Sequence, residues 1–194
     1  MKLEIIILLS YLLGSIPFGF IITKIFLNKD IRNIGSGNIG ATNVLRTGNK
    51  FIGYMTLSLD VLKAVLPLLY IKAYQQEFIY ISSLCIFIGH LFPIWLKFKG
   101  GKGVATYIGF LLAANYLLCF VFIFCWLIVV FISKYSSLSS IISLMIIPFV
   151  AIYLYPFFSS INNYMLIFIS IIIILKHYSN ILRLFNKKEN KISF

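Results

Sequence analysis

Long apolar runs constrain the fold more than any other feature of this sequence. They begin at residue 3 and recur along the chain, which has 61% hydrophobic and only 11% charged residues. A soluble domain carries about 25% charged residues, and a helix needs roughly 20 largely apolar residues to cross a bilayer. The chain is therefore predicted to be an all-α, polytopic membrane helix bundle, with residues 1–194 forming a single integral membrane domain.

Hydropathy predicts membrane spans near residues 3–27, 51–71, 78–96, 104–133, 138–156 and 161–176. The first is interpreted as a retained span, because no small-residue cleavage site follows it as in a signal peptide. The run 104–133 is too long for one upright helix. It is either one tilted helix or two short helices broken near Ala113-Ala114-Asn115. In the second case the half-run 104–114 is a partial or distorted span.

The distribution of positive charge favours the broken run. Polar loops at 28–50 and 97–103 follow the first and third spans, so they share one membrane face. With seven spans, the basic tail 176–194 joins them, and this face holds most of the 17 basic residues. The positive-inside rule makes that face cytoplasmic and also explains the net charge of +12 without nucleic acid. We predict seven transmembrane helices, one of them short, with the N-terminus outside and the C-terminus cytoplasmic.

The first polar loop contains the most informative stretch, residues 35–46, which read GSGNIGATNVLR. Its glycines allow close backbone approach, so that successive N–H groups can form an anion-binding nest. Arg46 can hold a phosphate through two parallel hydrogen bonds. Glycines alone would be typical of a flexible linker, but their clustering with donors and an arginine favours a phosphate site. The residues proposed for it are Gly35, Ser36, Gly37, Gly40, Thr42, Asn43 and Arg46.

The second polar loop repeats this chemistry within residues 89–106, GHLFPIWLKFKGGKGVAT. Lys102 lies between glycines and is the better candidate for a ligand contact, whereas Lys97 is interpreted as an interfacial anchor. A basic interfacial turn with Trp95 and Phe98 in the aromatic belt is compatible with the same pattern. The glycines expected to approach a ligand are Gly100, Gly101 and Gly103.

Charged and polar residues at two further places are candidates. His177, Asn180 and Arg183 recur at spacings of three and would share a helical face if the last span continues. An ordinary amphipathic helix explains this spacing equally well. Asp60 and Lys63 lie inside the second span, where a mutual ion pair that fixes helix packing is the favoured interpretation.

These segments together resemble the bacterial acyl-phosphate:glycerol-3-phosphate acyltransferase family. Ile34–Arg46 is similar to its first motif, Gly89–Thr106 to its second and His177–Glu189 to its third, in order along nearly the whole chain. The chain departs from the family pattern at Lys187 and Ala64, where glycine is usual.

The resemblance implies an enzyme of phospholipid biosynthesis in the bacterial cell (inner or plasma) membrane, with its active site at the cytoplasmic face. It implies acyl transfer from acyl phosphate to the sn-1 hydroxyl of glycerol 3-phosphate, giving lysophosphatidic acid. No cofactor and no metal are implied, and the protein would function as a monomer.

The resemblance also implies roles for individual residues. The catalytic group, which would bind glycerol 3-phosphate, is Ser36, Arg46, Lys102, His177 and Asn180. The acyl-phosphate group would be held by Gly37, Asn38, Gly40, Ala41, Thr42, Asn43, Gly100, Gly101 and Gly103. Structural roles fall to Glu189, Asp60 and Lys63. The base for the hydroxyl stays open between His177 and the substrate's own phosphate.

Two other functions are compatible with the residues. A transporter of phosphate or an organophosphate would use seven spans and phosphate-binding loops, but transporters commonly bind near the midplane between repeats. Here the candidate residues lie at one interface. A lipid-binding scaffold at the membrane surface would explain the basic tail but not the glycine loops.

Overall fold

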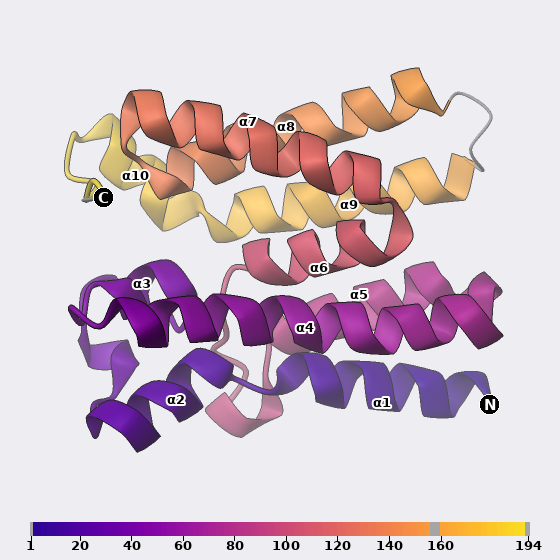
Figure 1. Ribbon diagram of the computed structural model, residues 1–194, viewed down its shortest axis with the longest axis horizontal. Helices are drawn as coiled ribbons and strands as arrows, with labels where there is room; N and C mark the ends of the chain where they lie inside the picture. The colour runs from indigo at the N-terminus through magenta and orange to yellow at the C-terminus, as the bar shows by residue number, and fades with distance from the viewer. Residues whose placement is uncertain (1, 156–159, 193–194) are drawn as a thin grey trace. The chain divides into compact units, whose positions relative to one another are not determined.

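The computed structural model describes residues 2–155 and 160–192, and every regular element within these ranges is helical (Figure 1). The predicted all-α class is therefore confirmed. The chain divides into two compact units, Met1–Ala114 and Asn115–Phe194, and each is described here by itself.

The first unit begins with a span that a proline divides. Its elements are α1 (Leu3–Ser15), α2 (Phe18–Leu27), η1 (Ile31–Asn33), α3 (Ala41–Leu45), α4 (Lys50–Tyr74), η2 (Gln76–Phe78), α5 (Ile79–Leu91), η3 (Ile94–Leu96) and α6 (Val104–Ala114). Pro17 cannot donate a backbone hydrogen bond and disfavours helical geometry at Ile16, whose ψ is 116°. The helix therefore breaks between α1 and α2, although together they form one apolar stretch long enough to cross a membrane.

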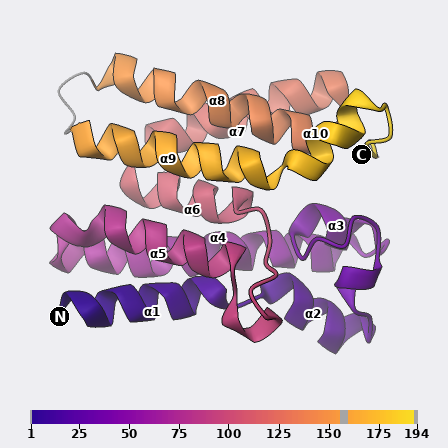
Figure 2. The same ribbon diagram turned by 180° about the vertical axis from the view of Figure 1, so that it is seen from behind.

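Glycines allow the helices of the first unit to approach closely. A Cβ on Gly14 would overlap the backbone of Ile86, and one on Gly89 would overlap the carbonyl of Tyr11. Backbone-to-backbone contact therefore joins α1 and α5, as small residues do in other membrane bundles. Behind this pair, the segment between α5 and α6 runs beside the junction of α1 and α2 (Figure 2), where Trp95 Nε1 donates to Ser15 Oγ at 2.9 Å.

Helix α6 is short. Non-helical backbone precedes its first residue, and a lysine side chain bonds to its last turn. Gly103, which is buried and has φ of 91°, packs on the ring of Phe87 of α5, so non-helical backbone lies inside the unit directly before α6 begins. At the other end, Lys72 Nζ donates to the carbonyl of Ala113 at 2.9 Å and satisfies one of the last-turn acceptors. Non-helical backbone at membrane depth is tolerated where protein buries it.

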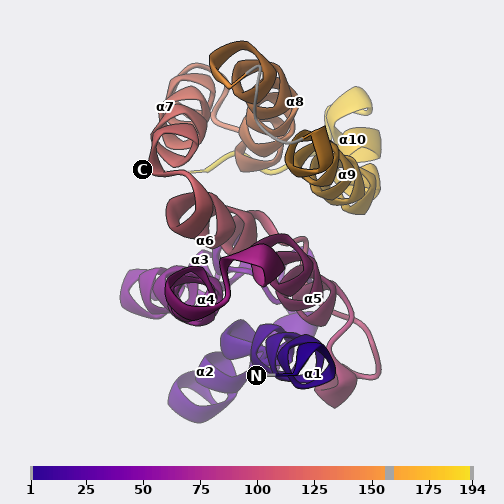
Figure 3. The same cartoon turned by 90° about the vertical axis from the view of Figure 1, so that its right-hand side faces the viewer.

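The second unit consists of α7 (Tyr116–Ser133), α8 (Ser136–Leu154), α9 (Ser160–Lys176) and α10 (Tyr178–Phe185). The long apolar run is broken where expected, because α6 ends at Ala114 and Asn115 Oδ1 accepts from the N–H of Leu118 to cap α7. Seen end-on (Figure 3), α8 lies beside both α7 and α9. Trp126 Nε1 donates to Ser140 Oγ at 3.1 Å and links α7 with α8.

Five helical stretches among the described residues are long and apolar enough to cross a membrane, namely Leu3–Leu27, Lys50–Tyr74, Gln76–Leu96, Tyr116–Ser133 and Ser136–Leu154. A sixth results if Asn163–Lys176 and Tyr178–Phe185, bent by 55°, count as one span. Helix α6 falls short of this length. The protein is therefore a multi-pass membrane protein.

Candidate functional site

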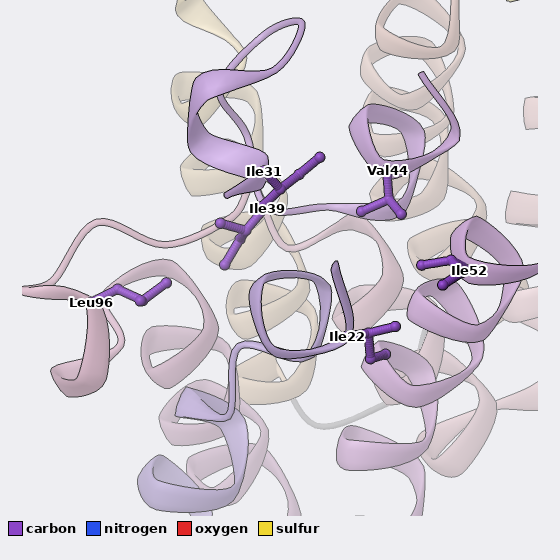
Figure 4. Packing of buried hydrophobic residues seen from close by; sticks show 6 residues of the cluster. All are labelled: Ile22, Ile31, Ile39, Val44, Ile52 and Leu96. Carbon is purple, nitrogen blue, oxygen red and sulfur yellow. The ribbon is translucent and has the colours of Figure 1, made fainter. Parts of the chain in front are cut away.

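A buried apolar cluster folds the first polar loop onto the end of the first unit. Its members are Ile22, Ile31, Ile39, Val44, Ile52 and Leu96 (Figure 4). They come from α2, from the loop itself, from α3 and α4, and from the residue that precedes the second loop. The two loops thus lie at the same end of this unit, as expected, and the first is a folded element rather than a flexible linker.

The side chain of Asn43 organises the first loop from within. Its two Nδ2 protons are shared among the carbonyls of Ile31, Ile34 and Asn38, at N···O distances of 3.2, 2.9 and 2.8 Å. Its Oδ1 accepts from the N–H of Ser36 at 2.9 Å. Since Asn43 is 1% exposed, these bonds replace water for buried backbone groups. The amide of Asn43 therefore holds the loop together.

Two backbone amides of the stretch 35–46, where an anion nest is predicted, donate inside the loop. The N–H of Ser36 is bonded to Asn43, and the N–H of Gly37 donates to the carbonyl of Ile34 at 2.9 Å. Gly35 and Gly37 have φ values of 55° and 71°, which glycine adopts without strain. These glycines therefore form the turn that Asn43 closes, and their neighbouring amides are used inside it.

The side chains that this turn presents are those of Ser36 and Arg46. Ser36 is exposed, and Arg46 follows α3 with its chain lying against Gly35. Arg46 Nη1 is 3.5 Å from Asn43 Oδ1. Gly40 precedes α3, and Ala41 and Thr42 form its partly exposed first turn. A hydroxyl and a guanidinium are thus carried on one rigid loop.

The second loop packs directly on the last turn of α5. The N–H groups of Gly100 and Gly101 donate to the carbonyls of Leu91 and His90, both at 3.1 Å. A Cβ on Gly101 would overlap the ring of His90. These two amides therefore donate inside the protein, contrary to the expectation that they approach a ligand. Lys102, partly buried, and Gly103, with φ of 91°, lie between them and α6.

A buried charged group lies beneath the second loop. Lys63 Nζ is 2.8 Å from Asp60 Oδ1, the ion pair expected within the second span. The same ammonium donates to the carbonyl of Ile16 at 2.8 Å and contacts His90 Nδ1 at 2.9 Å. The cost of burying this pair is offset by the attraction between the two charges and by the two further polar contacts of the ammonium. The group joins the α1–α2 break, α4 and α5.

The third motif lies in the second unit, where the chain bends at His177. This buried residue precedes α10, and its Nδ1 donates to the carbonyl of Ile173 at 2.8 Å. Because a carbonyl only accepts, the neutral ring carries its proton on Nδ1 and has an acceptor at Nε2. The bend of 55° replaces the continuous helical face that the spacing suggested.

Glu189 ties the tail to two helices. Its carboxylate accepts from Asn180 Nδ2 at 2.7 Å, from Arg183 Nε at 2.6 Å and from Ser137 Oγ of α8 at 2.9 Å. Burial by itself raises the pKa of Glu189, but the hydrogen bonds from Arg183, Asn180 and Ser137 outweigh it, so the pKa is lowered. A charged carboxylate thus holds the third motif.

We expect this attachment to weaken in acid. A carboxyl whose folded-state pKa is below its unfolded value contributes stability that is fully present above the unfolded value, 4.5, and lost as pH falls through the folded pKa. The melting temperatures of the wild type and of Glu189→Gln in detergent should therefore differ by a constant amount at neutral pH and converge below pH 4.5. The exposed Glu77→Gln is the control, and it should match the wild type throughout.

The departure from the family pattern at Lys187 has a backbone explanation. Lys187 has φ of 55°, and the N–H groups of Lys187 and Lys188 donate to the carbonyls of Leu184 and Arg183. This pair of bonds is the Schellman arrangement that ends many helices, usually with glycine at the left-handed position. The tail therefore keeps the conformation that glycine favours, with a strained lysine in its place.

We expect Lys187→Gly to stabilise the protein by about 0.5–1 kcal/mol, because the left-handed strain of a side chain exceeds the added flexibility of glycine. The melting temperature in detergent should rise by about 2 °C. Lys188→Gly removes the same charge from the next residue and is the control. An equal rise in both variants would mean that charge, not backbone strain, is responsible.

Two residues at these sites were not singled out from the sequence. His90 lies inside the apolar run 78–96. Its position could have identified it, because ionisable residues within membrane spans are rare and commonly functional. Ser137 had no signal, because its partner Glu189 is distant in sequence. Among the described residues, no three His, Cys, Asp or Glu side chains are grouped to hold a metal ion.

Known proteins resemble this chain over nearly its full length. Residues 4–187 match the family described as Glycerol-3-phosphate acyltransferase. A glycerol-3-phosphate acyltransferase of Pelagibacter ubique is 56% identical over 98% of both chains, and one of Bartonella henselae is 47% identical over 97% of this chain and 90% of its own. The crystal structure of PlsY (YgiH), an integral membrane glycerol 3-phosphate acyltransferase, in its glycerol 3-phosphate form has a TM-score of 0.91 and 34% identity, covering 98% of this chain and 95% of its own. This chain therefore belongs to the glycerol-3-phosphate acyltransferase family.

Proposed function

We propose that this acyltransferase takes its acyl group from an acyl phosphate and transfers it to the sn-1 hydroxyl of glycerol 3-phosphate. The hydroxyl oxygen bonds to the acyl carbon, the bond from that carbon to the phosphate oxygen breaks, and inorganic phosphate leaves. The product is lysophosphatidic acid. PlsY was solved in both a glycerol 3-phosphate form and a lysophosphatidic acid form, which supports this substrate and product.

The observation that carries the proposal is the gathering of two rigid, cationic loops at one end of the first unit. Ser36 and Arg46 are held there by the Asn43 turn, and Lys102 belongs to the loop that packs beside it. An acyl phosphate is already activated, so transfer needs positioning and charge stabilisation rather than a covalent enzyme intermediate. The sequence contains no G-x-S-x-G elbow and no Cys–His arrangement that would indicate one.

We assign binding of glycerol 3-phosphate to Ser36, Arg46, Lys102, His177 and Asn180. Arg46 and Lys102 neutralise phosphate, and Ser36 contributes a hydroxyl donor. His177 offers an acceptor at Nε2 when neutral and a donor when protonated, which suits either a hydroxyl or a phosphate. Two bases for the hydroxyl proton remain candidates, namely His177 and an oxygen of the substrate's own phosphate.

The acyl phosphate is assigned to the first turn of α3 and to the segment before α6. Ala41 and Thr42 are partly exposed, and Gly103 brings the backbone of the second loop to the start of α6. Asn38, Gly37, Gly40, Asn43, Gly100 and Gly101 contribute by shaping these two loops. Asp60 and Lys63 contribute by fixing the helices next to the second loop, and Glu189 contributes by holding α10, which carries Asn180.

In the membrane, we propose seven crossings with the N-terminus outside and both loops and the tail at the cytoplasmic face of the bacterial inner membrane. The break at Asn115, which makes α6 a short crossing, supports the odd number. The concentration of lysine and arginine in the loops and tail supports the orientation. The protein is expected to act as a monomer.

The donor is tested by supplying purified protein with labelled glycerol 3-phosphate and one of three donors, namely palmitoyl phosphate, palmitoyl-CoA or palmitoyl acyl carrier protein. Lysophosphatidic acid should form with palmitoyl phosphate alone. Equal or faster formation from either thioester would refute the proposed donor while leaving the acyltransferase activity in place.

A further inference from the structure

We propose that His90 is a positioning residue for the second glycine loop, and that Asp60 and Lys63 serve to fix its ring. The inference rests on the proposed binding role of Lys102, which belongs to that loop. It assigns a function to the buried charged group, which would otherwise be a costly feature of a membrane span.

The Lys63 ammonium has three close partners in this group. It forms an ion pair with Asp60 Oδ1 at 2.8 Å, donates to the Ile16 carbonyl at 2.8 Å and lies 2.9 Å from His90 Nδ1. An ammonium has three donors and no acceptor, so His90 Nδ1 must accept. The proton of the neutral imidazole is therefore on Nε2, and the orientation of the ring is set from the side of α4.

The opposite side of the His90 ring contacts the second loop. The ring atom nearest to the position of a Cβ on Gly101 is His90 Nε2, so ring and loop backbone are in direct contact. The main chain of His90 also accepts from the N–H of Gly101 at 3.1 Å. Lys102 is the next residue along the chain. A different ring orientation would therefore displace the backbone that carries Lys102.

The charge balance of the group suits this role. Asp60 and Lys63 cancel, so the group adds no net charge beneath the loop, and the Lys63 side chain is 3% exposed. Replacing a buried ion pair with apolar residues of similar size often leaves stability unchanged or higher. The specific orientation that the Lys63 ammonium imposes on the His90 ring gives the pair a role that apolar residues could not fill.

The test compares His90→Asn with the wild type, because the asparagine oxygen can replace Nδ1 as acceptor for Lys63 while nothing replaces Nε2 beneath Gly101. We expect KM for glycerol 3-phosphate to rise about tenfold, the factor expected for loss of one buried interaction of ordinary strength. A merely structural role would reduce the amount of active protein and leave KM unchanged. Ser83→Ala, a buried change elsewhere in α5, is the matched control and should not alter KM.

Limited proteolysis supplies a readout that does not depend on catalysis. The initial rate of tryptic cleavage after Lys102, relative to cleavage after the exposed Lys97, should rise about tenfold in His90→Asn, because cleavage follows the population of opened loop. Asp60→Asn combined with Lys63→Met removes both charges together and should raise KM and this cleavage ratio in the same direction. It also keeps the test valid if His90→Asn fails to fold.

Lys102→Met, measured in parallel, separates this inference from the proposed function. If Lys102→Met raises KM while His90→Asn changes neither KM nor the cleavage ratio, the inference is overturned and the site assignment stands. If Lys102→Met leaves KM unchanged, the assignment of Lys102 fails, and the cleavage ratio alone decides. A raised ratio supports positioning of the loop by His90, and an unchanged ratio overturns it.

Discussion

Replacing Arg46 with alanine is expected to lower kcat/KM for acyl transfer by about 10²- to 10³-fold. This loss is typical when an enzyme loses one preorganised hydrogen-bond donor that stabilises negative charge in the transition state. The reason is geometric. Arg46 follows α3, its aliphatic part lies against Gly35, and the residue is partly exposed on the loop that also presents Ser36. A guanidinium in this position can hold a phosphate through two parallel bonds at little entropic cost.

Arg32→Ala is the matched control for this prediction. Arg32 lies in the same loop but is paired with Asp30 at 2.6 Å and lies over the ring of Phe20. An exposed ion pair of this kind contributes about 0–1 kcal/mol, so activity should stay within a few-fold of the wild type. Arg46→Lys keeps the charge without the bidentate geometry and should lie between the two. Steady-state kinetics that gave Arg46→Ala and Arg32→Ala similar activities would refute the role assigned to Arg46.

The helical architecture was predictable because its cause is local. A stretch of apolar residues has few alternatives to a helix in a membrane, so the spans followed from hydropathy alone. The break at Asn115 was also predictable, since asparagine is a good helix cap and the run was too long for one crossing. The bend at His177 was not predictable. It occurs within an uninterrupted helical pattern, and the contacts of Glu189 with α8 and α10 hold the chain after it.

The sequence was sufficient to predict which segments form the candidate site. It was not sufficient to predict which residues shape the loops and which contact a ligand. Sequence shows that Asn43 and the glycine amides can form hydrogen bonds, but not which partner they find. In the structure, the carbonyls of Ile31, Ile34 and Asn38 take the donors of Asn43, and His90 and Leu91 take those of Gly101 and Gly100. The first loop bonds to itself and the second bonds to the last turn of α5, so donors assigned to a ligand instead shape the loops. Arg46, Ser36 and Lys102 are the better candidates for contact with phosphate.

Asn43→Asp tests this division of roles with a side chain of the same shape. The introduced carboxylate can still accept from the N–H of Ser36, but it would face the carbonyls of Ile31, Ile34 and Asn38 with an acceptor in place of a donor. Losing the two hydrogen bonds that the Nδ2 protons can make, at about 1 kcal/mol each, reduces the population of the binding-competent loop by about 30-fold, and repulsion between oxygens adds to this. We expect kcat/KM to fall by at least that factor at neutral pH.

Asn49→Asp makes the same chemical change where the structure predicts no harm. Asn49 caps α4, and its Oδ1 accepts from the N–H of Ile52 at 3.1 Å. Aspartate is an equally good cap, and its charge interacts favourably with the helix N-terminus, so activity and melting temperature should be retained. Asn43→Ala removes the amide donors and the acceptor of the Ser36 N–H without adding charge, and it should be less severe than Asn43→Asp. A loop-forming role of Asn43 predicts faster tryptic cleavage after Arg46 in both variants. If Asn43 instead contacted the substrate through its amide, both variants would raise KM while cleavage within the first loop stayed slow.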